Sequence, residues 1–226
     1  MPFGKDFNTI IIMDKNQIFV ITINRELGSG GRTVGEKLAE KLGVTFYDKA
    51  VIKGLEEKYN LTVEEIEKMR DKQHSWWSDL KRVSGIGEGL VSSSRYISEI
   101  GKEPDVLTTE SVFKAETEIL EDIARVESCV IAGRSGFFVF RNHPNHLRIM
   151  IQASMPFRVK RLMRKKNITE KEALKIIEMV DKMRENYVKR YTGTTRYDTR
   201  NYDLVITADG KTEDQIVDQI LLYIEQ

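Results

Sequence analysis

Five short runs of apolar residues recur along this chain, and each is bounded by polar or glycine-containing segments. The runs are rich in valine, isoleucine and aromatic residues, and each is too short to form a helix of ordinary length. These features are typical of strands that are buried on both faces of a sheet. The predicted strands cover residues 18–23, 44–47, 128–132, 147–151 and 202–207.

The stretches between these runs have the apolar spacing of amphipathic helices. Residues 33–42 place Val34 and Leu38 on one face, and residues 106–126 follow the same period. Capping boxes that begin at Thr169 and Thr212 predict two further helices. Strands that alternate with helices predict an α/β fold with a mainly parallel sheet covered on both sides.

The connection between the first strand and the first helix is a glycine cluster, Gly28-Ser29-Gly30-Gly31. Strand, glycine loop and helix together aim backbone N–H groups and the positive helix end at a phosphate. The full phosphate-loop pattern is G-x-x-x-x-G-K-[ST]. In the window at residues 26–33, Gly31 and Thr33 fit the pattern, whereas Glu26 replaces the first glycine and Arg32 the lysine. The local pattern alone also allows a tight turn without a ligand.

Basic residues gather at residues 158–166 and 182–200, after the fourth predicted strand. Phosphoryl transfer needs positive charge around the oxygens of the transferred group. We expect Arg32 to approach the terminal phosphates and Thr33 to hold Mg²⁺ through its hydroxyl. Arg158, Arg161 and Arg184 are candidates for clamping the transferring group. A solvated basic face is the alternative interpretation for any one of these arginines.

Two polar residues follow buried strands at the edge where open α/β sheets bind their ligands. Asp48 ends the second predicted strand, and Arg134 follows the third. For Asp48 the pattern leaves two roles open, since this residue can also cap a helix that begins near Lys49. We predict that Asp48 and Arg134 face one acceptor cavity.

The net charge, hydropathy and cysteine content of the chain limit the classes of function that it can have. The net charge of +1 gives no general argument for binding nucleic acid or a membrane, and no apolar stretch is long enough to span a bilayer. The single cysteine, Cys129, excludes an internal disulfide and lies in an apolar run, which indicates a buried structural thiol. No signal peptide is recognisable. We expect a cytoplasmic protein, and the sequence leaves its oligomeric state open.

Several blocks of the chain resemble the cytidylate kinase-like family, a branch of the nucleoside monophosphate kinases. The blocks read ITINRELGSGGRTVGEKLAEKLGVTFYDKAVI, CVIAGRSGFFVF, IMIQASMPFRVKRLMRKK, VDKMRENYVKRYTG and NYDLVIT. The resemblance implies one P-loop kinase domain, a three-layer sandwich around a five-stranded parallel sheet. Residues 18–54 and 106–226 would form the core, residues 55–105 a helical NMP-binding insertion, and residues 158–200 a lid.

The resemblance also implies roles for single residues. Asp48 corresponds to the aspartate of the monophosphate pocket, and Arg134 to the arginine of the D-G-R motif, which binds the acceptor. Asp181 and Arg184 correspond to the lid aspartate and arginine, three residues apart. Ala132 stands where true cytidylate kinases have the aspartate of D-G-R, which predicts that a contact to the ribose or base is lost.

The leading hypothesis is an ATP-dependent phosphotransferase that acts with Mg²⁺ on a nucleoside monophosphate or another small acceptor. The alternative is a nucleotide-binding regulatory module with little or no turnover, which the replacements at Arg32 and Ala132 motivate. Nucleic-acid binding through residues 158–200 is weaker, because the chain lacks a net positive field and an aromatic RNA-binding signature. The acceptor itself cannot be read from the sequence.

Overall fold

The computed structural model describes residues 12–48 and 110–225. The predicted insertion at residues 55–105 lies outside these ranges. The chain divides into two compact units, one formed by residues 1–47 and 123–226 and the other by residues 48–122. The description that follows concerns the first unit, which contains the sheet.

The sheet has five parallel strands in the order β2-β3-β1-β4-β5. This confirms the predicted number of strands and their parallel arrangement. Each predicted run contributes one strand, although β1 begins and ends two residues later than expected. The strands are β1 (Val20–Arg25), β2 (Thr45–Tyr47), β3 (Cys129–Ala132), β4 (His146–Gln152) and β5 (Leu204–Thr207).

Helices follow the strands in the expected alternation. The first of them begins at Gly31, two residues before the predicted start, and the capping boxes at Thr169 and Thr212 are both formed. The helices are α1 (Gly31–Leu42), α6 (Glu110–Val126), α7 (Gly136–Val139), α8 (Met155–Lys166), α9 (Glu170–Thr192) and α10 (Glu213–Ile224), with a short 3₁₀ helix, η1 (Thr199–Asn201).

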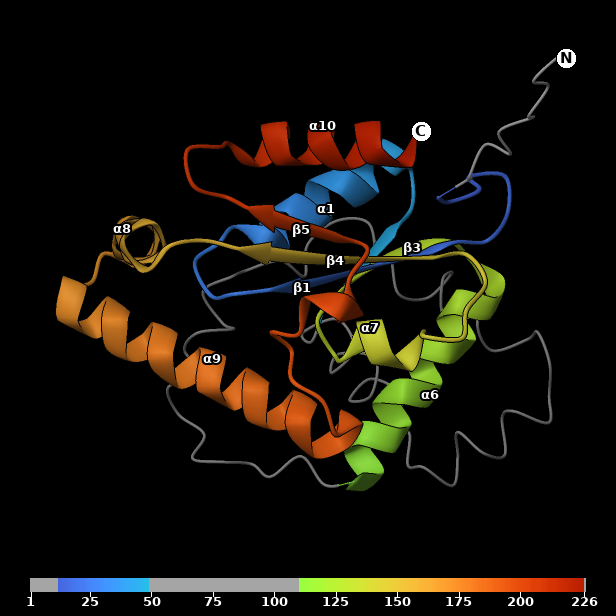
Figure 1. Ribbon diagram of the computed structural model, residues 1–226, viewed down its shortest axis with the longest axis horizontal. Helices are drawn as coiled ribbons and strands as arrows, with labels where there is room; N and C mark the ends of the chain where they lie inside the picture. Colours follow the sequence, from blue (N-terminus) through green and yellow to red (C-terminus); the bar gives the residue numbers. More distant parts are fainter. Residues whose placement is uncertain (1–11, 49–109, 226) are drawn as a thin grey trace, which may run out of the picture. The chain divides into compact units, whose positions relative to one another are not determined.

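Helices cover both faces of the sheet, as Figure 1 shows for α1 and α10 on one side and α7 and α9 on the other. The side under α1 and α10 holds the larger core, in which Ile21 and Ile149 pack with Leu38 and Ile220. On the other side, a smaller cluster contains Phe137, Met150, Val188 and Tyr202. Neighbouring positions of β4 therefore face opposite layers, as the two-residue period of a strand requires.

The carboxyl ends of β1, β3 and β4 lie next to one another. Ala132 at the end of β3 is in register with Ile23, and Arg25 at the end of β1 is in register with Ile151. From β1 the chain continues to β2 and then to β3, which lies beside β1. It next continues to β4, which pairs with the other edge of β1. This reversal of strand order is the place where open parallel sheets bind ligands.

Cys129 is fully buried, as its apolar surroundings in the sequence predict. Burial raises the pKa of its thiol to about 12, followed by a smaller effect from the charge of Glu127. The thiol is therefore protonated at neutral pH, which makes it a packing residue. Among the described helices, we find none with the length and apolar character that a membrane crossing requires.

Candidate active site

The glycine loop joins the end of β1 to the first turn of α1. Gly28 and Gly30 both have φ near +88°, a conformation that residues with a Cβ rarely adopt. Gly30 is the N-cap of α1 and has no side chain to cap the helix, while the Ser29 hydroxyl accepts a hydrogen bond from the Gly31 N–H at 3.4 Å. The N–H groups of a helix's first turn have no acceptor within the helix. The loop therefore presents backbone donors and the positive end of the α1 dipole.

Glu26, which replaces the first glycine of the phosphate-loop pattern, fastens the loop to the next strand. Its Oε2 accepts a hydrogen bond from the Ala153 N–H at 3.0 Å, just after β4. Its Oε1 lies 3.2 Å from Nη1 of Arg158 in α8. The glutamate thus links three segments that meet at the carboxyl edge of the sheet.

Asp181, on α9, is the acidic centre of this region and is only 7 % exposed. Its Oδ1 accepts a hydrogen bond from the Leu27 N–H at 3.0 Å, and its Oδ2 accepts one from Arg158. Arg184 and Arg196 each place an Nη1 atom 3.7 Å from Oδ1. One carboxylate therefore holds the glycine loop and three arginines together.

The same three arginines donate to backbone carbonyls at the end of β1 and just after it. Arg158 Nε donates to the carbonyl of Leu27 at 3.0 Å, and Arg184 Nη1 donates to the carbonyl of Arg25 at 3.1 Å. Arg196 Nη2 donates to that same Arg25 carbonyl. The structure therefore brings the predicted site residues Arg158, Asp181 and Arg184 directly against the predicted phosphate loop. Their catalytic roles stay a prediction.

Arg196 is fully buried. Its Nε and Nη1 atoms have no hydrogen-bond partner within residues 12–48 and 110–225. Burial lowers the pKa of its guanidinium, and the positive charge of Arg184 lowers it further. Arginine nevertheless stays charged in proteins. Arg196 is therefore a buried cation whose charge is opposed by Asp181 and whose Nη2 is bonded to the end of β1.

Arg161 and Arg32 lie at the edge of the loop and pair with carboxylates. Arg161 forms an ion pair with Glu213 of α10, and its Cζ lies 3.5 Å from the position of a Cβ built on Gly30. Arg32 pairs with Glu36 one turn along α1 at 2.7 Å, and its guanidinium carbon lies 5.8 Å from the centre of the Phe46 ring. Both arginines are near the loop.

The turn after β3 carries Arg134 in a strained backbone. Gly133, Arg134 and Ser135 have φ values of +84°, +54° and +52° in succession. Such values cost about 1–3 kcal/mol for a residue with a side chain and are characteristic of functional sites. The Arg134 guanidinium carbon lies 4.9 Å from the centre of the Tyr187 ring on α9. Asp48 is the first residue of the second compact unit, so its predicted meeting with Arg134 stays a prediction.

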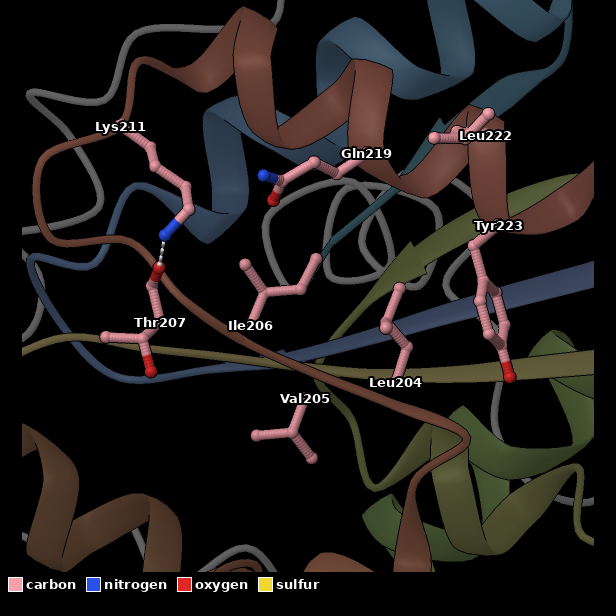
Figure 2. Close-up of a pocket in the computed structure, with 8 residues that line it drawn as sticks. All are labelled: Leu204, Val205, Ile206, Thr207, Lys211, Gln219, Leu222 and Tyr223. Atoms are coloured by element: carbon pink, nitrogen blue, oxygen red, sulfur yellow. Dashed lines mark hydrogen bonds between the residues drawn. The ribbon is translucent and has the colours of Figure 1, made fainter.

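A groove lies along β5, the strand at one side of the sheet, next to α10, and Figure 2 shows Leu204, Val205 and Tyr223 along it. Its lining contains none of the predicted site residues. The groove is therefore separate from the glycine loop, and we assign it no part in the site.

Two arginines of the site were missed by sequence reasoning. Arg25 ends β1, is 8 % exposed and contacts the glycine loop. Arg196 lies in a polar segment that has neither helical nor strand periodicity, so its burial is evident only from the tertiary structure. Arg25 could have been chosen from the sequence, because it is a charged residue at the carboxyl end of a buried strand. Arg134 was selected on that same feature.

A parallel sheet whose central strand leads through a glycine loop into a helix defines the class of P-loop α/β proteins. Within it, the chain belongs to the cytidylate kinase-like family, whose model matches residues 20–209. This confirms the resemblance that the sequence blocks indicate. A search of curated proteins found no match.

Among solved structures, the chain is similar to an uncharacterized protein from Eubacterium ventriosum, with 24% identity and a TM-score of 0.64 over 92% of this chain and 99% of that one. A shikimate kinase from Bacteroides thetaiotaomicron aligns with 15% identity and a TM-score of 0.49, over 92% and 99% of the two chains. A gluconokinase from Sinorhizobium meliloti aligns with 13% identity and a TM-score of 0.49, over 92% of each chain. Because the protein from Eubacterium ventriosum is less than 25% identical to this chain, its similarity shows the fold alone.

Proposed function

We propose that the protein transfers the γ-phosphoryl group of ATP to a nucleoside monophosphate or another small acceptor. The observation that carries this proposal is the contact between the glycine loop and the three arginines held by Asp181. Backbone donors on one side and guanidinium groups on the other suit a polyphosphate. Membership of the cytidylate kinase-like family supports the same reaction class.

The proposed phosphate cradle is the segment Gly28-Ser29-Gly30-Gly31-Arg32-Thr33. Mg²⁺ normally keeps several waters and binds through phosphate oxygens and one or two protein groups. The Thr33 hydroxyl in the first turn of α1 fits this requirement, and no group of three or more metal-binding side chains occurs among the described residues. The metal would neutralise charge on the phosphates.

In the proposed reaction, the bond between the γ-phosphorus and the β–γ bridging oxygen breaks, and a bond to an acceptor oxygen forms. The electron pair of the broken bond leaves with ADP. A monophosphate acceptor attacks through an already deprotonated oxygen, so no proton needs to be removed. The protein's contribution is then positioning and electrostatic stabilisation of the equatorial oxygens by Arg158, Arg161 and Arg184, with Asp181 orienting the arginines. Arg134 and Asp48 would bind the acceptor.

A coupled assay that follows ADP formation tests this proposal, with ATP–Mg²⁺ and a panel of nucleoside monophosphates and small alcohols. Acceptor-dependent ADP formation is the expected result. Calorimetry with ATP, run in parallel, separates the two functions that the sequence left open. Binding of ATP without turnover on the full panel identifies a regulatory module, and the absence of both contradicts the site itself.

A further inference from the structure

Arg134, the predicted acceptor arginine, lies over an aromatic ring from a distant part of the chain. Its guanidinium carbon is 4.9 Å from the centre of the Tyr187 ring on α9. A cation is attracted to the face of a ring within about 6 Å. The attraction acts on the charge of the guanidinium and does not use its N–H donors. The contact is therefore compatible with two parallel hydrogen bonds from the same guanidinium to a phosphate.

The Tyr187 ring is itself fixed by packing. It is partly buried against the smaller core cluster under the sheet. Its centre is also 5.0 Å from that of the Tyr191 ring, one turn further along α9, in an edge-to-face arrangement. A side chain held by packing on two sides keeps one orientation. The tyrosine is therefore a rigid support for the cation that lies over it.

The backbone on the other side of this contact is also constrained. Gly133, Arg134 and Ser135 all have positive φ, a conformation that persists where the surrounding structure determines it. A long arginine side chain loses rotamer freedom when it is fixed. Because Arg134 already lies over Tyr187, part of that freedom is lost on folding and not on binding of a ligand, which favours the bound state.

The helix that carries Tyr187 also carries two residues of the glycine-loop site. Asp181 and Arg184 each bond the backbone between the end of β1 and the glycine loop. Positions 181, 184 and 187 follow one another at intervals of three residues, which places them on one side of an α-helix. One side of α9 therefore contacts both the proposed donor site and Arg134.

We propose that Tyr187 is a positioning residue for the acceptor: its ring sets the place of the Arg134 guanidinium, and α9 fixes that place relative to the glycine loop. This inference rests on the proposed phosphotransferase function and deepens it by naming what orients the acceptor. In phosphoryl transfer, the attacking oxygen must be in line with the bond that breaks, so a displaced acceptor reacts more slowly. Because Tyr187 acts through Arg134, its removal should affect the acceptor and not ATP.

The test compares Tyr187→Phe with Tyr187→Leu. Phenylalanine keeps the ring face that attracts a cation, whereas leucine keeps only an apolar side chain. The acceptors titrated in the coupled assay are CMP, UMP, AMP and GMP, and the one that wild type phosphorylates fastest is used. Tyr187→Leu should raise the KM of this acceptor about tenfold, as expected for a cation–π contact away from bulk water. The KM of ATP should stay within about twofold, and Tyr187→Phe should resemble wild type.

A double-mutant cycle with Arg134→Ala separates positioning from packing. If Tyr187 acts through Arg134, loss of the ring has no further effect in a protein that already lacks the arginine. The acceptor kcat/KM of Arg134→Ala/Tyr187→Leu should then equal that of Arg134→Ala within about twofold. Two independent effects would instead multiply.

Phe138→Leu is the matched control for lost packing. Phe138 is also partly buried against the smaller core cluster, and the guanidinium carbon of the exposed Arg141 is 4.2 Å from its ring centre. Phe138→Leu should lower the melting temperature as Tyr187→Leu does, but it should keep the wild-type KM for both substrates. If Tyr187→Leu does not fold, Tyr187→Met takes its place in the cycle, because methionine fills irregular space without a ring.

Three results would overturn the inference while the kinase proposal stands. Multiplying effects in the cycle, or an equal rise in the KM of ATP and of the acceptor, would make Tyr187 a packing residue. A Tyr187→Phe variant as impaired as Tyr187→Leu would assign the effect to the hydroxyl and not to the ring face. Phosphorylation of small alcohols only would mean that Arg134 binds no acceptor phosphate. If wild type neither binds ATP nor forms ADP with any acceptor, the phosphotransferase proposal itself fails and takes this inference with it.

Discussion

Arg158 and Asp181 form a buried ion pair beneath the glycine loop, joined through Nη2 and Oδ2. The two residues are on consecutive helices, α8 and α9, and both bond the backbone of Leu27. Asp181 accepts a hydrogen bond from the Leu27 N–H, and Arg158 donates one to the Leu27 carbonyl. The pair therefore fixes the conformation of the loop. It also keeps an arginine with its charge close to the proposed phosphate position.

The first prediction concerns the carboxylate of this pair. Asp181→Asn should lower the free energy of unfolding by about 3–5 kcal/mol, because it removes the buried carboxylate charge that Arg158, Arg184 and Arg196 share. Urea denaturation measures the effect. Asp198→Asn is the control, since Asp198 pairs with a highly exposed Arg200 and should leave the urea midpoint unchanged. Equal midpoints for the two variants would show that Asp181 does not hold the cluster together.

Gly28 gives a second test of the loop. A Cβ at Gly28 would lie 2.8 Å from the Arg158 carbonyl oxygen, whereas one at Gly43 meets nothing within 4 Å, although both glycines have positive φ. Gly43→Ala should cost about 1–2 kcal/mol, the strain of the left-handed backbone alone. Gly28→Ala should cost roughly 1–3 kcal/mol more, because it also overpacks the contact. Thermal or urea unfolding that gives the same loss for both would contradict this close packing.

The third prediction concerns Glu213, which pairs with Arg161 at the edge of the loop. Burial would raise the pKa of this carboxyl group, but a backbone hydrogen bond and the charge of Arg161 outweigh burial and hold it below the usual value. Glu213 is therefore ionised and opposes a phosphate. Glu213→Gln should strengthen ATP binding by about fivefold, corresponding to ~1 kcal/mol.

Calorimetry measures this change, with Asp214→Asn as the control. Asp214 is the adjacent acid and pairs with Lys37 at 2.7 Å, on an exposed surface. Its neutralisation should leave ATP affinity unaltered. Weaker ATP binding by Glu213→Gln would indicate instead that Glu213 positions Arg161 for the ligand.

The acceptor site gives the fourth prediction. If Arg134 grips the acceptor phosphate with two hydrogen bonds, Arg134→Ala should raise the acceptor KM more than the ATP KM. Arg134→Lys should recover little, because lysine lacks the planar fork. Asp48→Asn should affect the same acceptor constant if the two residues share one cavity. Because Ala132 stands where true cytidylate kinases have a carboxylate, we expect a preference for an acceptor other than CMP. Efficient CMP phosphorylation would contradict that preference alone.

The fifth prediction is a loss of stability in acid that originates at His146. Its Nδ1 contacts the Phe140 carbonyl at 2.9 Å and its Nε2 contacts the Thr22 hydroxyl at 2.8 Å. A carbonyl can only accept, so Nδ1 carries the proton of the neutral ring and Nε2 accepts from Thr22. Burial lowers the pKa of this histidine to about 4. The unfolded chain therefore binds a proton between about pH 6.5 and pH 4 that the folded chain does not.

The stability that the neutral ring contributes is complete above about pH 6.5 and is lost as pH falls towards 4, by roughly 3 kcal/mol. Urea unfolding from pH 7 to pH 4 measures this slope. His146→Gln should be less stable at pH 7 but should show a flatter dependence on pH over the same interval. An unchanged slope in the variant would assign the acid sensitivity to other groups.

The sequence by itself determined the strands, the alternation with helices and the glycine loop. These features follow from local physics: apolar runs of strand length, helical spacing, capping boxes at Thr169 and Thr212, and glycines where φ must be positive. The blocks around the loop were also enough to identify the family. Arg134 and Asp181 could be chosen because a motif marks them.

Only the tertiary structure shows which acidic and basic side chains pair with one another. The sequence could not pair Glu26 with Arg158, or bring Arg196 to the end of β1, because these partners are far apart along the chain and meet only when α8 and α9 pack against the loop. It also could not reveal that Arg134 lies over the Tyr187 ring, since contacts between distant residues depend on coordinates. Which arginine serves a phosphate is set by the positions of the other charges, and those positions are a property of the folded chain.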